Sequence, residues 1–218
     1  MIANYLKNYA TRYGKRLVLR GAVALLVFGV TFAVHLYSKS PSLPLAGFEG
    51  TTSTVVPNCT PDPNFNPDDK DITSASATVT RVIDGDTVDV NLNCKIETIR
   101  FIGMDTPETV DPRKPVQCFG KEASDNSKSI LTGKTITLQF DPTQDRRDKY
   151  GRLLAYIILD GVNIDEQLVQ QGFAREYTYK IPYEYQSQFR TDQKEARAEG
   201  LGLWASSTCD GKVPLPVS

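Results

Sequence analysis

The sequence predicts an α+β fold in which five short strands and three helices form one small domain after an apolar N-terminal segment. Residues 134–140 (K-T-I-T-L-Q-F) alternate apolar and polar side chains, as a half-buried strand does. Gly172 and Gly200 each follow a segment that reads as a helix, and glycine is the usual residue just after a helix ends. Closing the strands into a small barrel would remove exposed sheet edges.

Each element is predicted from its own segment. Strands are expected over residues 76–83, 87–92, 97–104, 134–140 and 153–159. Alternation in the first strand would place Arg81 on the same face as Ala77 and Val79. Helices are expected over residues 120–131, 163–171 and 184–199, the second with Asn163 as its N-cap. Residues 105–119 contain three prolines and are expected to form a loop.

The N-terminus combines a basic leader with an apolar run. Residues 1–20 carry five basic side chains and no acidic one, and residues 21–36 carry no charge. Residues 17–37 are just long enough to span a bilayer, and the positive-inside rule places the leader in the cytoplasm. We therefore expect residues 21–37 to be a transmembrane anchor. The alternatives are the apolar region of a cleaved signal peptide and a buried soluble helix.

The remaining domain boundaries follow from composition. Residues 38–74 are rich in Pro, Ser, Thr, Asn and Asp and are expected to form an extended spacer. Residues 75–207 are expected to hold the folded domain, and residues 208–218 a C-terminal tail. In both membrane interpretations the folded domain is exported.

Charge and histidine content exclude several classes of function. Without the leader the chain has 20 basic and 26 acidic residues, so the folded part is mildly acidic. A protein that binds DNA mainly by neutralising phosphates is expected to be basic, so any nucleic-acid contact here must be local or involve a bound cation. The sole histidine, His35, lies in the apolar N-terminal run. The folded part therefore has no Ser-His-Asp triad, no Cys-His pair and no histidine-ligated zinc.

Four cysteines are present, and an even number in an exported chain suggests disulfides. Three pairings are possible. We favour Cys94–Cys118 with Cys59–Cys209, because the latter two residues flank the domain; free buried thiols are the alternative.

Three segments carry the chemistry: I-D-G-D-T-V (residues 83–88), R-F-I-G-M-D-T-P-E-T (residues 100–109) and D-K-Y-G-R-L-L-A-Y (residues 148–156). Each alone could be an ordinary turn. Together they offer the carboxylates of Asp86 and Asp105 and the backbone carbonyl of Thr106 as hard oxygen ligands. Such ligands suit a hard cation that keeps several waters.

The same segments supply groups for phosphodiester hydrolysis. Glu108 is a candidate for deprotonating a water molecule. Arg100 and Arg152 are always charged and carry forked donors, which suit a phosphodiester whose charge rises in the transition state. Two arginines, two aspartates and one glutamate form a workable set for metal-assisted phosphodiester hydrolysis.

These three segments, together with F-G-K-E-A (residues 119–123), resemble the signature segments of the staphylococcal nuclease (thermonuclease) family, in the same order. The resemblance runs from about Thr78 to Trp204. It implies an OB-fold, a five-stranded β-barrel with three helices, and Ca²⁺ as the cofactor. It also implies a bacterial source, DNA and RNA as substrates, and endonucleolytic cleavage that leaves 3′-phosphate ends.

The resemblance also assigns roles by position. Asp86, Asp105 and the Thr106 carbonyl resemble the calcium ligands, and Glu108 resembles the general base. Arg100 and Arg152 resemble the pair that binds phosphate and stabilises the transition state. Residues that resemble the substrate contacts are Lys149, Tyr150, Tyr177 and Tyr179, with tyrosines that would lie against a base.

The resemblance and the N-terminal segment together predict a nuclease on the outer face of a bacterial cytoplasmic membrane, or one secreted after signal cleavage. A monomer is the default expectation. The alternative is a non-catalytic OB-fold module that binds nucleic acid or a protein at the cell surface. The complete set of charged side chains favours the nuclease, because a binding module has no need to keep like charges together across a cleft.

Overall fold

The computed structural model describes residues 59–110 and 115–212, all in the second of two units, Met1–Gly50 and Thr51–Ser218. The expected leader and membrane segment at residues 1–37 lie outside the described residues. Within the described ranges no helix is both long and apolar enough to cross a bilayer.

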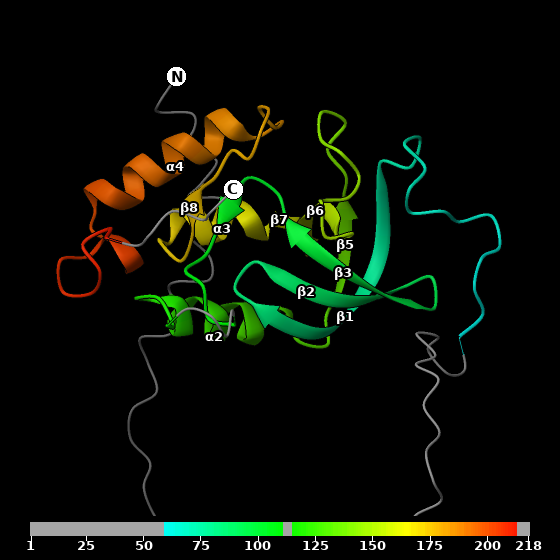
Figure 1. The fold of residues 1–218 in the computed structure, drawn as a ribbon, viewed down its shortest axis with the longest axis horizontal. Helices are drawn as coiled ribbons and strands as arrows, with labels where there is room; N and C mark the ends of the chain where they lie inside the picture. Colours follow the sequence, from blue (N-terminus) through cyan, green and yellow to red (C-terminus); the bar gives the residue numbers. More distant parts are fainter. Residues whose placement is uncertain (1–58, 111–114, 213–218) are drawn as a thin grey trace, which may run out of the picture. The chain divides into compact units, whose positions relative to one another are not determined.

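Five strands form a closed barrel (Figure 1). They are β1 (Ser74–Asp84), β2 (Thr87–Leu92), β3 (Lys95–Phe101), β5 (Thr135–Gln139) and β6 (Leu153–Leu159). Neighbouring strands follow the order β3-β2-β1-β5-β6, and β3 also pairs in parallel with β6, where Ile99 lies opposite Leu153. This pairing closes the barrel, so the predicted five-stranded barrel is confirmed. Three shorter strands are β4 (Met104–Asp105), β7 (Val162–Asn163) and β8 (Arg175–Glu176).

The long strand β1 pairs with two neighbouring strands of the barrel. Its first half pairs with β5 and its second half with β2, with register shifts in the β2 pairing. The shift between Val79 and Arg81 is a β-bulge, which bends a strand and reverses its alternation. Val82 therefore enters the core, while Arg81 lies exposed and binds Asp89 at 2.6 Å. The expectation that Arg81 shares the buried face was wrong for this reason.

The third predicted strand is divided at Gly103. Strand β3 ends at Phe101, and Gly103 adopts a φ of 77°, a left-handed conformation that favours glycine. The Tyr183 hydroxyl donates to the Gly103 carbonyl at 2.9 Å, and a Cβ on Gly103 would lie 2.4 Å from the Tyr183 ring. The chain turns at this point and continues as β4, which the sequence analysis did not separate from β3.

The described residues contain three α-helices, α2 (Gly120–Leu131), α3 (Ile164–Gln170) and α4 (Gln186–Ala198), and the 3-10 helix η2 (Gly202–Trp204). The predicted helices are confirmed to within two residues. The Asn163 side chain accepts a hydrogen bond from the Glu166 backbone N–H at 3.2 Å and so caps α3 as expected. Gly172 and Gly200 both have positive φ at the expected helix ends. Figure 1 shows α3 and α4 on one side of the strands and α2 at another.

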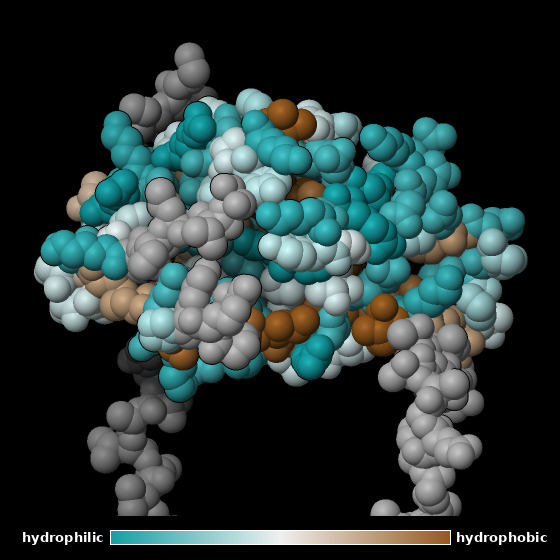
Figure 2. Space-filling model, viewed as in Figure 1, coloured by the Kyte–Doolittle hydropathy of each residue, from teal (hydrophilic) through white to brown (hydrophobic). Residues whose placement is uncertain are grey.

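One core fills the barrel and the space beneath the helices. Its fully buried side chains include Val79, Val88, Ile99, Leu138, Leu153, Tyr156, Ile157, Leu168 and Phe189. On the face shown in Figure 2, hydrophilic residues cover most of the described surface and hydrophobic residues form separate small patches. Burial of the alternating apolar residues is the main stabilising contribution to this fold.

Two disulfides join Cys59 to Cys94 and Cys118 to Cys209, so the favoured pairing was wrong. Cys94 lies in the β2–β3 turn, where the neighbouring Asn93 side chain bonds the backbone of Asp62. The segment before β1 therefore passes this turn and brings Cys59 to it. The pairing of Cys59 with Cys209 was expected because both flank the domain, and their positions in the sequence do not reveal the contacts of Cys59 with the β2–β3 turn.

The described part of the expected spacer, residues 59–73, lies against the barrel. Arg147 binds Asp68 at 2.6 Å and Glu97 at 2.8 Å, and Phe65 and Ile72 pack on the core. Together with Cys59–Cys94, these contacts fasten the segment to β2, β3 and the loop before β6.

Asp165, in the first turn of α3, is completely buried. Its Oδ1 accepts a hydrogen bond from the Ile157 backbone N–H at 3.1 Å, and within the described residues Oδ2 has no hydrogen-bond partner. Burial raises the pKa of this carboxyl well above its ordinary value. A raised pKa means that Asp165 favours folding most at low pH and that this contribution is lost as pH rises toward the folded-state pKa.

Asp165→Asn should therefore gain stability relative to wild type as pH rises from 4 to 7, by at least about 1 kcal/mol in the free energy of unfolding. Urea denaturation of both proteins at each pH measures this difference. Asp160→Asn is the matched control, because it removes a carboxylate from an exposed turn. A difference that is constant or falls with pH would contradict the assignment.

Candidate active site

The turn between β1 and β2 carries two buried aspartates, Asp84 and Asp86, on either side of Gly85. A Cβ on Gly85 would lie 2.7 Å from the Thr106 side chain, so only glycine permits this close approach. The Ser127 hydroxyl of α2 donates to the Gly85 carbonyl at 2.7 Å and so fastens the turn to this helix. The I-D-G-D segment is thus a packed, buried turn.

Arg100 of β3 joins the two predicted metal-ligand carboxylates. Its Nη1 lies 2.8 Å from Asp86 Oδ2, and its Nη2 lies 3.1 Å from Asp105 Oδ1. The antiparallel pairing of Thr87 with Arg100 positions these groups, since Asp86 directly precedes β2. One guanidinium therefore holds carboxylates that lie 19 residues apart in the sequence.

Asp105 has a second cationic partner that the sequence analysis missed. Arg175 donates to Asp105 Oδ2 from Nε at 3.1 Å and from Nη2 at 3.0 Å. The two residues lie opposite each other in the β4–β8 pairing, and both are buried. Two-residue strands leave no periodic pattern, so no signal in the sequence identified Arg175.

Thr106 contacts Asp86 through groups that the sequence analysis did not predict. Its backbone N–H and its hydroxyl both donate to Asp86 Oδ2, at 2.9 and 3.0 Å. The hydroxyl of Thr87 donates to Asp86 Oδ1 at 2.9 Å. Thr106 therefore orients the Asp86 carboxylate.

Negative charge is concentrated here. Burial and the charge of Asp86 raise the pKa of Asp84 to about 6. Burial and Asp86 likewise raise the pKa of Asp105, against the opposing effects of Arg100 and Arg175. A site that raises the pKa of its own carboxyl groups would be stabilised by an added cation.

The donor set fits a hard cation with few protein ligands. Among the described residues no group of three or more His, Cys, Asp or Glu side chains is arranged to hold a metal ion. Asp86 and Asp105, bound to the same guanidinium, are the candidate carboxylates, so water and backbone oxygens would complete the shell.

Glu108 lies on the loop that follows β4. Its Oε1 accepts from the Val110 backbone N–H at 2.7 Å, and its backbone N–H donates to Gln117 Oε1 at 2.8 Å. The next residue, Thr109, donates its hydroxyl to Asp84 at 2.7 Å. These contacts fasten the loop beside the aspartate turn, and the negative charge of Glu108 contributes to the raised pKa of Asp84.

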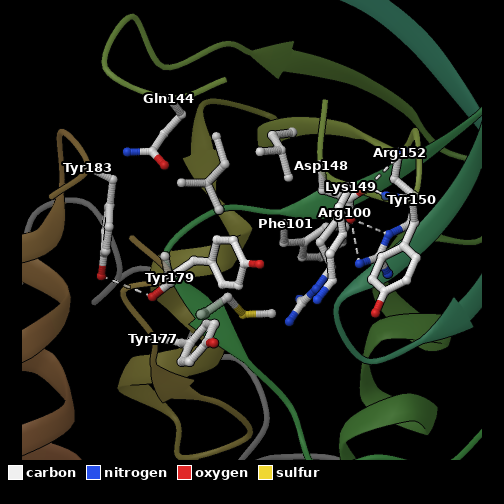
Figure 3. Close-up of a pocket in the computed structure, with 14 residues that line it drawn as sticks. Arg100, Phe101, Gln144, Asp148, Lys149, Tyr150, Arg152, Tyr177, Tyr179 and Tyr183 are labelled. Atoms are coloured by element: carbon white, nitrogen blue, oxygen red, sulfur yellow. Dashed lines mark hydrogen bonds and ion pairs between the residues drawn. The ribbon is translucent and has the colours of Figure 1, made fainter. Parts of the chain in front are cut away.

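A cleft of about 190 Å³ brings most of the remaining predicted residues together (Figure 3). Its lining includes six of them: Arg100, Lys149, Tyr150, Arg152, Tyr177 and Tyr179. Asp86, Asp105, Thr106 and Glu108 do not line it. Arg100 connects the two groups, because it lines the cleft and also binds both aspartates.

Arg152 is held at the start of β6 by Asp148, which lies four residues earlier. Asp148 Oδ2 accepts from Arg152 Nε at 2.7 Å and Nη2 at 2.6 Å, while Oδ1 accepts from the backbone N–H groups of Tyr150 and Arg152. Asp148 lies within a segment that the sequence analysis identified, but its role became visible only from these contacts. The Arg152 guanidinium also lies 5.4 Å from the Tyr150 ring centre.

The other side of the cleft is aromatic. The rings of Tyr177 and Tyr179 are 6.4 Å apart at their centres, and Tyr179 is about half exposed. Tyr183 and Gln144 complete this side (Figure 3). Gln144 Nε2 donates to the Pro182 carbonyl at 3.1 Å, which fixes the orientation of its amide. Neither Tyr183 nor Gln144 was predicted as a site residue.

The fold and the site define an OB-type barrel with a carboxylate cluster beside a cleft that combines arginines with tyrosines, a combination suited to a phosphodiester and its bases. The family model described as "Staphylococcal nuclease homologue" matches residues 98–206, half of the chain. The chain therefore belongs to the staphylococcal nuclease family.

Individual relatives are similar over about 60% of the chain. The chain is 44% identical over 133 residues to Endonuclease YncB of Bacillus subtilis (strain 168), covering 61% of this chain and 63% of that protein. It is 42% identical over 131 residues to the SPbeta prophage-derived endonuclease YokF of the same strain, covering 60% and 44%. It is 43% identical over 128 residues to the Thermonuclease of Staphylococcus hyicus, covering 59% and 75%. The chain thus spans less than two thirds of the two Bacillus proteins, and the relatives' names support a nuclease-type hydrolase.

Arg175→Met should destabilise the protein by about 2–4 kcal/mol, because it removes one of two cationic partners from a buried carboxylate. Urea denaturation at pH 7 measures the effect. Arg190→Met is the matched control, since the exposed Arg190 side chain lies at a longer distance, 3.6 Å, from its partner Glu176, and its loss should cost at most about 1 kcal/mol. Equal effects of the two substitutions would contradict the structural role of Arg175.

Proposed function

We propose that this chain is a calcium-dependent nuclease that hydrolyses phosphodiester bonds in single-stranded or frayed DNA and RNA and leaves 3′-phosphate ends. The observation that carries the proposal is the position of Arg100, which binds both Asp86 and Asp105 and also lines the cleft that contains Arg152. Arg100 thus links the candidate cation ligands to a cleft that holds both candidate phosphate donors, which supports the proposal.

Asp86 and Asp105 would hold the cation, with the Thr106 carbonyl as a further ligand. When bound, Ca²⁺ would neutralise charge on a phosphate oxygen and so lower the barrier to nucleophilic attack. Its positive charge would also offset the mildly acidic balance of the domain. The hydrogen bonds from Thr106 keep the Asp86 carboxylate oriented before any ligand binds.

Glu108 is the proposed general base. Its carboxylate takes a proton from a water molecule as the water oxygen bonds to phosphorus. The bond between phosphorus and the 5′ oxygen breaks, and that oxygen leaves and takes a proton from solvent. The products are a 3′-phosphate and a 5′-hydroxyl.

Arg100 and Arg152 stabilise the charge that builds on the phosphate oxygens in the transition state. Their guanidinium groups are held in advance, Arg100 by two aspartates and Arg152 by Asp148, so little ordering is needed when substrate binds. Lys149 adds a positive charge near the Tyr150 ring, 5.3 Å from its centre.

The tyrosines favour unpaired nucleotides. Tyr150, Tyr177 and Tyr179 lie in the cleft with at least part of each ring accessible, and a base can stack on such a ring only after leaving its helical stack. Stacking on aromatic rings is tolerant of sequence, so we propose single-stranded or frayed DNA and RNA as the substrate class.

We further propose that the nuclease domain, residues 75–207, acts as a monomer outside the cytoplasmic membrane. The basic leader at residues 1–20 and the apolar run at residues 21–37 support a single-pass anchor, with secretion after cleavage as the alternative. Within the expected spacer, residues 38–58 would separate the domain from the membrane, because residues 59–73 pack on the barrel. The two disulfides agree with an oxidising compartment.

The test is hydrolysis of heat-denatured DNA by the purified full-length chain, with calcium chloride and then with EDTA. We expect cleavage that requires calcium and yields 3′-phosphate ends, detected by end-labelling before and after phosphatase treatment. Calcium binding without any hydrolysis would instead favour the non-catalytic binding module.

Arg152→Ala should lower kcat by about 10²–10³-fold, because removing one preorganised donor to a charged transition state has an effect of that size. Steady-state cleavage of heat-denatured DNA measures it. Arg147→Ala is the matched control on the same loop, since Arg147 binds Asp68 and Glu97 and does not line the cleft. A similar kcat for Arg152→Ala and Arg147→Ala would refute the role of Arg152.

Glu108→Gln should abolish most turnover while leaving the fold intact, because glutamine is nearly the same shape but is not a base at neutral pH. The readout is kcat together with the thermal unfolding midpoint of the same sample. Wild-type turnover in this variant would exclude Glu108 as the base.

A further inference from the structure

Gln117 forms two hydrogen bonds with the backbone of Glu108. The Glu108 backbone N–H donates to Gln117 Oε1 at 2.8 Å, and the Gln117 backbone N–H donates to the Glu108 carbonyl at 2.9 Å. These two hydrogen bonds join the backbone of Glu108 directly to Gln117. One residue therefore holds the backbone of Glu108 from both its donor and its acceptor side.

Gln117 is itself held by its neighbours. Its carbonyl accepts from the Gly120 backbone N–H at 3.0 Å, at the start of α2. Gly120 packs tightly against the loop, since a Cβ there would lie 3.0 Å from the Pro107 carbonyl and 3.2 Å from the Glu108 carbonyl. The next residue, Cys118, forms a disulfide with Cys209.

Cys209 belongs to a segment that is fixed to the domain. Leu203 of η2 is buried, and its backbone N–H donates to the Gly172 carbonyl at 2.9 Å. The Gly211 backbone N–H donates to the Leu203 carbonyl at 2.9 Å. The Cys118–Cys209 disulfide therefore connects the loop of Glu108 to the end of α3.

The second disulfide offers a contrast within the same chain. Cys59–Cys94 joins the segment before β1 to the β2–β3 turn. Neither of its cysteines lines the cleft or is adjacent to Gln117 in the sequence. Both disulfides restrain the unfolded chain, but only one adjoins the proposed base.

We propose that Gln117 is a positioning residue for Glu108, and that the Cys118–Cys209 disulfide holds Gln117 in place, so that turnover depends on this disulfide and not on Cys59–Cys94. The inference rests on the proposed function, in which Glu108 acts as the base. A general base works only within hydrogen-bond reach of its water, and small displacements of catalytic groups are costly. Substrate binding uses the cleft, which does not include Gln117. Loss of the hydrogen bonds between Gln117 and Glu108 should therefore leave KM nearly unchanged.

The first test compares two substitutions of Gln117 in the full-length chain, with heat-denatured DNA and calcium chloride. Gln117→Met removes the acceptor for the Glu108 N–H and should lower kcat about tenfold, with KM within about twofold of wild type. Gln117→Glu keeps an acceptor oxygen and should restore kcat to within about threefold of wild type.

The matched control is Asn163→Ala. It removes the same kind of bond, from a side-chain amide oxygen to a backbone N–H, at the N-cap of α3. It should lower the thermal unfolding midpoint and leave kcat unchanged. A purely structural role for Gln117 would make its variants behave in this way, which would overturn the proposal, as would equal kcat values for Gln117→Met and Gln117→Glu.

The second test removes each disulfide separately. Cys118→Ser with Cys209→Ser should lower kcat at least about fivefold with KM nearly unchanged, while Cys59→Ser with Cys94→Ser should leave kcat within about twofold of wild type. Circular dichroism at the assay temperature verifies folding, and the Gln117 variants decide the proposal if a cysteine variant does not fold. Equal kcat values for the two folded cysteine variants would overturn the inference. Absence of cleavage by the wild type would instead overturn the proposed function.

Discussion

The ion pairs of the Arg100 guanidinium with Asp86 and Asp105 are the interaction on which the site depends. One carboxylate comes from the β1–β2 turn and the other from β4, and their like charges would repel each other in a buried position without a shared cation. Arg100 satisfies both and lines the cleft beside Arg152. The closure of the barrel through β3 and β6 places Arg100 at this point, because Arg100 lies opposite Leu154 in that pairing.

The features around this interaction hold it in one geometry. Gly85 allows Thr106 to approach the turn that carries Asp84 and Asp86. Arg175 donates to Asp105 Oδ2, the oxygen that Arg100 does not bind. One disulfide fastens the segment before β1 to the barrel, and the other fastens the segment before α2 to the C-terminal segment around Cys209. A site prepared in this way loses little free energy to ordering when a cation and a substrate bind, which is how preorganisation contributes to catalysis.

Much of the fold follows from the sequence because the relevant patterns are local. Alternation predicts β5, and an N-cap with a terminal glycine predicts α3. The errors occur where the local structure depends on a contact with residues far away in the sequence. The bulge that exposes Arg81 depends on the pairing of β1 with β2, and the break at Gly103 depends on Tyr183, 80 residues later.

The same reasoning explains which candidate site residues could be predicted. Asp86, Arg100, Asp105 and Glu108 belong to segments that resemble the family's motifs, so their positions could be transferred. Arg175 belongs to a two-residue strand without a pattern, and the cysteine pairing depends on which turns meet in space. The sequence therefore predicts the chemical groups, and the structure shows the contacts that hold those side chains.

Calorimetric titration of calcium chloride into the full-length wild type and Asp105→Ala most directly tests the central claim, that Asp86 and Asp105 form one cation site organised by Arg100. We expect one calcium ion to bind per wild-type chain, and binding at least about tenfold weaker in the variant, since loss of a carboxylate ligand removes a charged oxygen from the shell. Equal affinities in the two proteins, with the variant shown to be folded, would contradict this account.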